Sequence, residues 1–210
     1  MRDADGFTMV EVLIASAITI TVVGAIVAVI TPAQDVLRAQ GDAADLHQRL
    51  RAIADTLAGD LRAASAVRPY RVGAVRDDGN AGIYYRPDAM TVLGDTTRTY
   101  YLKTDSFELM QYDGGLSDLP MIEHVAGLTF DYFGAASAQD RTLVRFEPAV
   151  LTDGPWSEDA SHRRVDADLR RIRAVRVSVR LESTVPSLRR FVPDEEIVLH
   201  VALRNLAPGQ

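Results

Sequence analysis

Glu11 is an ionisable side chain at the start of the most apolar stretch of the sequence. The 19 residues from Val12 to Ile30 carry no charge, and the apolar run is interrupted only by Ser16, Thr19, Thr21 and Gly24. A carboxylate inside a membrane segment costs about 2.5–3.5 kcal/mol on insertion scales, so such residues are candidates for a function. Two interpretations are open: the carboxylate lies shallow enough to reach the lipid headgroups, or it meets a cationic partner.

A cationic partner arises if the chain is cut after Gly6. Phe7 then carries a new α-amino group, four residues before Glu11 and on the same helix face. In stacked copies, the amine of one subunit can pair with the carboxylate of its neighbour, which offsets the cost of two desolvated charges. This pairing predicts a role for Glu11 in packing one subunit against another.

Other residue types that perform chemistry show no catalytic or metal-binding pattern. The chain has no cysteine, and its histidines are scattered without ligand spacing: His47, His124, His162 and His200. No nucleophile elbow, phosphate-binding loop or dinucleotide fingerprint is present. We therefore predict no catalytic residue, no metal site, no cofactor and no small-molecule substrate, and the chain is not expected to be an enzyme.

Charged clusters in the second half of the chain are interpreted as solvated surface. The acidic side chains that could supply oxygen ligands to calcium fit no defined binding loop: Asp153, Glu158, Asp159 and Asp194–Glu196. Residues 162–190 contain nine arginines, which makes a DNA-binding patch worth testing. Carboxylates intervene, however, strand alternation accounts for Arg176 and Arg180, and the net charge is −6, so nucleic acid is not an expected partner.

The apolar segment has the length of a transmembrane helix. Nineteen helical residues can cross a hydrocarbon core of about 30 Å, and the segment lacks the polar stripe of a soluble core helix. A cleaved secretory signal is a poor alternative, because the apolar run before Ala15-Ser16-Ala17 is short and the longer run follows it. Pro32 removes a backbone hydrogen bond and is expected to kink the helix.

Beyond Pro32 the pattern becomes amphipathic and then changes to strands. An apolar seam at helical spacing comprises Leu46, Leu50, Ile53, Leu57 and Leu61. A continuous helix Phe7–Ala66 would span about 90 Å. The strands predicted after residue 67 are Gly82–Arg86, Thr97–Lys103, Phe107–Tyr112, Met121–Phe133, Leu143–Phe146, Ile172–Glu182 and Ile197–Arg204. The expected fold class is α+β: one long helix whose seam packs on a mainly antiparallel β-sheet.

The N-terminal motif resembles a known signal. Gly6-Phe7-Thr8-x-x-Glu11 before a long apolar run is similar to the class III signal of type IV prepilins and type II secretion pseudopilins. The resemblance implies a leader at residues 1–6, cleavage between Gly6 and Phe7 by prepilin peptidase, N-methylation of Phe7, and filament assembly through Glu11. It also implies a transmembrane helix over 7–31, its amphipathic continuation over 32–66 and an extracytoplasmic β-rich domain over 67–210, a lollipop shape. The leader departs from the usual basic composition, since it contains one basic residue, Arg2, and two acidic residues, Asp3 and Asp5.

Weaker matches favour a minor subunit. Leu57–Ala64, with Asp60-Leu61-Arg62, resembles the first-helix end of J-type minor pseudopilins and W-type minor pilins, and Val125–Tyr132 and Leu203–Leu206 resemble later segments of that group. The resemblance implies an inner-membrane protein with a cytoplasmic N-terminus that joins other minor subunits and the major subunit at a filament tip. The alternatives are an uncleaved single-pass membrane protein with an extracytoplasmic binding domain, or a DNA-uptake pseudopilin.

Overall fold

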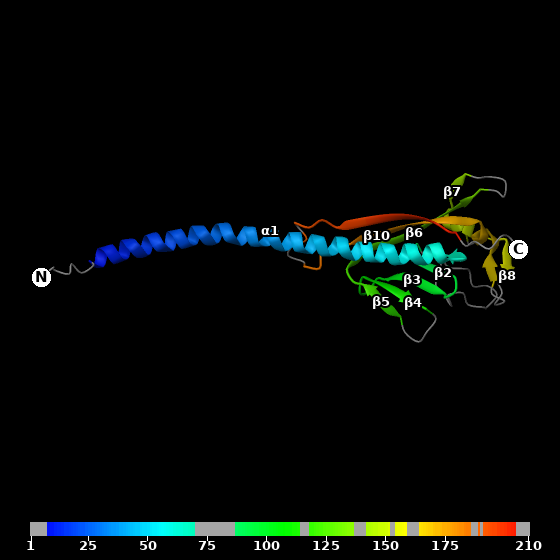
Figure 1. Ribbon diagram of the computed structural model, residues 1–210, viewed down its shortest axis with the longest axis horizontal. Coiled ribbons are helices and arrows are strands. Elements are labelled where there is room, and N and C mark those ends of the chain that lie inside the picture. Colours follow the sequence, from blue (N-terminus) through cyan, green and yellow to red (C-terminus); the bar gives the residue numbers. More distant parts are fainter. Residues whose placement is uncertain are drawn as a thin grey trace.

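The fold is one long helix whose distal half packs on antiparallel sheets (Figure 1). The computed structural model describes residues 8–69, 87–113, 118–136, 142–151, 154–158, 164–185, 189 and 191–204. Helix α1 is Met9–Ala63, 55 residues and about 82 Å long. The strands are β1 Ala66–Arg68, β2 Ala89–Leu93, β3 Arg98–Lys103, β4 Glu108–Tyr112, β5 Leu119–Ile122, β6 Val125–Ala135, β7 Leu143–Arg145, β8 Trp156–Glu158, β9 Arg164–Asp166, β10 Ile172–Leu181 and β11 Glu195–Ala202. Two 3₁₀ helices are η1 Pro148–Leu151 and η2 Ala167–Arg171.

The predicted α+β class is confirmed, with a difference in the number of sheets. One sheet has the order β1-β2-β3-β4-β5, a second has the order β11-β10-β6-β7, and β8 pairs with β9. Every strand pair among the described residues is antiparallel. The single sheet that we expected is therefore two main sheets, which share α1 and one core cluster.

The leucine seam of α1 is confirmed as the surface that meets the domain. Leu46, Leu57 and Leu61 have no exposed area, and Leu50 and Ile53 are also buried. They pack against residues of both main sheets, including Met90, Tyr100, Leu109, Val175, Val177 and Val179. The helix ends at Ala63 because Ala64 takes an extended conformation, and Ser65 N then donates to Leu93 O at 2.7 Å. The expected helical end at Ala66 was wrong, since Ala66 begins β1.

Several strands agree with the sequence pattern and one does not. The hairpin β3–β4 and the alternating strand β10 lie where they were predicted. Met121–Phe133 was expected as one strand, but it divides into β5 and β6 because His124 adopts a positive φ of 61°. The predicted strand Gly82–Arg86 lies outside the described residues.

The proximal part of α1 is not packed against the domain. From Met9 to Leu37 its large apolar side chains are exposed, and Ala39 is the first residue of the helix that is buried. Figure 1 shows this part extending away from the sheets. The helix continues without interruption through Pro32 and is gently curved in the figure, not broken at a sharp angle.

Candidate functional site

The N-terminal end of α1 is built around Glu11. Thr8 is the N-cap residue, and its backbone N and Oγ1 donate to Glu11 Oε2 at 2.9 and 3.0 Å. In return, Glu11 N donates to Thr8 Oγ1 at 3.3 Å. This is a capping box, in which two helix-end donors are satisfied reciprocally. A negative charge in the first turn also interacts favourably with the helix dipole. The carboxylate thus has partners within its own chain.

Thr8 was not predicted from the sequence as a partner of Glu11. A signal for it was present, since Thr followed three residues later by Glu, just before an apolar run, is the sequence signature of a capping box. Gly6 and Phe7 lie outside the described residues, so the structure places neither side of the predicted cut. Pro32 lies within the helix, in the stretch without domain contacts.

The proximal part of α1 suits an apolar environment. Its hydroxyl side chains donate to backbone carbonyls one turn earlier: Ser16 to Val12, Thr19 to Ala15, Thr21 to Ala17 and Thr31 to Val27, at 2.6–3.0 Å. These bonds leave no hydroxyl donor among these four in need of water. In the described part of the chain, α1 is the one helix long and apolar enough to cross a membrane.

Two aspartates on the distal half of α1 tie the helix to the domain. Asp60 accepts from Arg98 Nη1 at 2.5 Å and from the hydroxyl of Tyr100. Burial, followed by the hydrogen bond to Asp60 and its charge, raises the pKa of Tyr100, so the hydroxyl stays protonated and donates. Nearer the membrane-length segment, Asp42 accepts from the hydroxyls of Ser183 and Thr184. These contacts fix both ends of the seam.

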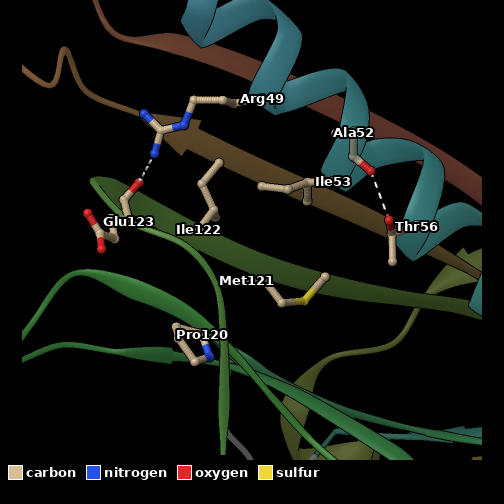
Figure 2. A pocket seen from close by; sticks show the side chains of 8 residues that line it. All are labelled: Arg49, Ala52, Ile53, Thr56, Pro120, Met121, Ile122 and Glu123. Carbon is tan, nitrogen blue, oxygen red and sulfur yellow. Dashed lines mark hydrogen bonds between the residues drawn. The ribbon is translucent and has the colours of Figure 1, made fainter.

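A shallow groove runs between α1 and β5 (Figure 2). It has a volume of about 420 Å³ and is lined by Arg49, Ala52, Ile53, Thr56 and Pro120–Glu123. Its two polar helix residues are already used, because Arg49 donates to Glu123 O and Thr56 donates to Ala52 O, both at 2.9 Å. The remaining lining is apolar except for the Glu123 side chain. The groove therefore offers mainly packing surface.

Several arginines of the arginine-rich stretch bind carboxylates in the described part of the chain. Arg176 and Arg145 both bind Asp131, the latter at 2.8 Å, and Arg189 binds Glu182 at 2.8 Å. Burial raises the pKa of Asp131, but the hydrogen bonds and charges of the two arginines outweigh it and hold the pKa below the usual value. These carboxylates offset the positive charge of the arginines that they bind.

The acidic residues considered for calcium do not converge where the structure describes them. Asp194 lies 3.9 Å from Arg180, and Glu195 lies 3.6 Å from His47. The described residues contain no group of three His, Asp or Glu side chains that could hold a metal ion. Asp153, Asp159 and His162 lie outside the described residues.

Comparison of the chain with protein-family models, with curated proteins and with solved structures finds no match.

Proposed function

We propose that the chain is a minor pilin or pseudopilin, a structural subunit that helps to initiate or cap a type IV pilus or type II secretion pseudopilus. One observation carries the proposal. A helix of 55 residues begins with a carboxylate, leaves its apolar proximal half uncovered and buries only its distal half in a domain. The exposed stretch Met9–Leu37 is about 43 Å long, which exceeds a hydrocarbon core of about 30 Å.

Such a stretch must be covered, and two environments can cover it. Before assembly it lies in the inner membrane, with the N-terminus cytoplasmic and the domain periplasmic. In the filament it lies in a bundle of like helices contributed by other minor subunits and the major subunit. The proposed role of the domain is to place the subunit at the filament tip. Prepilin peptidase is the partner proposed to cut between Gly6 and Phe7 and to methylate Phe7.

The capping box gives Glu11 a specific part in this exchange. In the separate chain its carboxylate is held by the N–H and hydroxyl of Thr8. After the proposed cut, the α-amine of Phe7 in a neighbouring subunit can replace these neutral donors with a charged one. The ammonium adds the attraction of an opposite charge to the hydrogen bond, so the bundle is favoured over the single helix in lipid.

Intact-mass spectrometry of the protein purified from its own host tests the proposal. The expected mass lacks residues 1–6 and carries one added methyl group. A full-length, unmethylated chain refutes the processing and, with it, the filament role. The test does not depend on the folding of any variant.

Two substitutions of Glu11 distinguish the role of its charge from the role of its hydrogen bonds with Thr8. Glu11→Gln keeps a side chain that can accept from Thr8 but removes the charge, whereas Glu11→Leu removes both. Because the proposed intersubunit pair needs the charge, both variants should enter the membrane normally and be recruited into filaments at least about tenfold less well. Recruitment of Glu11→Gln at the wild-type level would show that the charge is not used.

A second function is favoured by one observation. Thr8 already supplies hydrogen bonds to Glu11, so the carboxylate does not require a neighbouring subunit. The chain would then be an uncleaved single-pass membrane protein with an extracytoplasmic binding domain. An intact N-terminus in the mass measurement supports this alternative.

A further inference from the structure

Strand β11 forms a long and regular edge of the second main sheet. It has eight residues and pairs with β10 over its whole length without a register shift. Among the described strands, β10 is its only neighbour in the sheet. On the inner side it packs on α1, and His47 of α1 lies 3.6 Å from Glu195 at the start of the strand. Figure 1 shows β11 running beside α1.

The hydrogen-bond register identifies the backbone groups at the open edge. Leu203 N donates to Arg173 O at 2.8 Å, which makes these opposite residues a hydrogen-bonded pair. In an antiparallel ladder such pairs alternate, so the odd-numbered residues of β11 direct N–H and C=O toward β10. The even-numbered residues direct theirs to the edge that pairs with no other described strand: Glu196, Val198, His200 and Ala202. The edge therefore presents four N–H and four C=O groups in regular alternation.

The other edges of the two main sheets are protected. Strands β1 and β7 have only three residues each. Strand β5 has four, contains Pro120, and is displaced by a register shift between Leu109 and Met110. Short strands, proline and bulges are the usual means of preventing strand addition. Strand β11 has none of them, and its outward Val198 is 48% exposed.

We propose that β11 accepts an extended segment of a different protein as an additional strand of the sheet. The main-chain groups of the four even-numbered residues supply the hydrogen bonds, as in other cases of strand addition. Charge sets the orientation, because Glu196 places an exposed carboxylate at the start of β11, whereas Glu195 lies beside His47 of α1. The added strand is antiparallel like the rest of the sheet, apolar at its centre, and carries Lys or Arg at its C-terminal end, beside Glu196.

A second copy of this chain does not fit the edge, given the membrane anchoring proposed above. A twofold axis that pairs β11 with β11 antiparallel also reverses α1, whereas two copies anchored in one membrane have parallel helices. A twofold axis along the strands keeps the helices parallel. It also places each outward N–H opposite the same N–H of the second copy, so a donor faces a donor. A strand from another polypeptide meets neither restriction. This inference goes beyond the filament role, since a partner in the periplasm could supply the strand.

The test uses full-length protein in detergent micelles and a synthetic peptide of about ten residues that alternates Val and Thr and ends in two Lys. The matched peptide ends in two Glu. Hydrogen exchange is measured at each amide of β11. The even-numbered amides should exchange freely without peptide and slow by at least about tenfold with the Lys peptide, because each then donates to a partner. The Glu peptide should bind at least about tenfold more weakly at low salt.

Two variants at one position isolate the backbone contribution. Val198→Pro removes an outward N–H and leaves the bonds to β10 in place, so it should weaken peptide binding by about tenfold. Val198→Thr keeps the N–H and should bind nearly as well as the wild type. Thermal unfolding is measured for both, and His200→Pro is the second test of the edge if Val198→Pro fails to fold.

Three results overturn the proposal. The first is equal peptide binding by the proline variants and the wild type. The second is slow exchange of the even-numbered amides in the free monomer, because the edge is then already covered. The third is slow exchange accompanied by dimer formation in sedimentation experiments, since the occupant is then a second copy. None of these results bears on cleavage at Gly6–Phe7, which the mass measurement tests separately.

Discussion

Gly134 should be irreplaceable in β6, and the structure allows the cost of a single added methyl group to be estimated. A Cβ at this position would overlap the carbonyl oxygen of Arg171 and lie 2.5 and 2.7 Å from two ring atoms of Phe146. The overlapping atom belongs to the backbone, where η2 meets β10, so it cannot rotate away. The same corner is held by the Arg171 guanidinium, which donates to Ala135 O at 3.0 Å and lies over the Phe146 ring.

The change Gly134→Ala therefore forces two strands apart or displaces Phe146. Overpacking of this kind costs about 1–3 kcal/mol and more where the backbone must move, so we expect a loss of about 3 kcal/mol in the free energy of unfolding. That is a large part of the 5–15 kcal/mol typical of a folded domain. Urea unfolding of the domain, followed by circular dichroism in detergent, measures the loss as a lower midpoint at unchanged slope.

Gly127→Ala is the matched control in the same strand. Its added Cβ would have no neighbour nearer than 3.8 Å, at Arg180, which is ordinary contact distance. We expect its free energy of unfolding to stay within about 0.5 kcal/mol of the wild type. If Gly134→Ala is as stable as Gly127→Ala, then η2 does not approach β6 closely enough to exclude a side chain at position 134, and the estimated cost is refuted.

Two further predictions concern the seam and the surface ion cluster. Leu57→Ala should cost about 2–5 kcal/mol in urea unfolding because Leu57 is fully buried, whereas Leu37→Ala, at a residue 67% exposed on the same helix, should change the domain's stability by less than about 0.5 kcal/mol. Similar losses of stability in both variants would contradict the division of α1 into an exposed proximal part and a buried distal part. Arginine contacts lower the pKa of Asp131, so their stabilising effect is present above the ordinary aspartate pKa of about 3.9 and is lost as pH falls through the folded value. Unfolding at pH 7 and about pH 3 should show that Asp131→Asn reduces stability at neutral pH and flattens its fall in acid; parallel pH profiles would refute this.

The helix and the best-patterned strands were predictable because their signals are local. The seam of α1 repeats at helical spacing, and β10 alternates valine or leucine with polar residues, so each pattern reports the buried face directly. Strand β2 was missed because four of its five residues are buried, which leaves no alternation to detect. The break at His124 depends on a single positive φ, which the side-chain pattern of Met121–Phe133 does not specify.

The candidate site was only partly predictable for a similar reason. Glu11 was identified because a carboxylate is unusual beside an apolar run, and its local partner Thr8 lies within one turn. The contact of Asp42 with Ser183 joins residues 141 positions apart, and no local pattern indicates it. The edge of β11 likewise depends on which strands pair, which the composition of the strand does not specify.

The packing of β11 on α1 also determines the order in which the molecule can become stable. The helix precedes all of the described strands in the sequence, and the strand that covers one side of its seam follows all the others, so the contact closes a loop that contains both main sheets. Contacts this distant in sequence slow folding, and until they form the apolar seam is exposed to other chains. Pairing of β11 with β10 and α1 should therefore be the event that commits the domain to its native state, and a chain that stops before β11 should be a substrate for quality-control proteases.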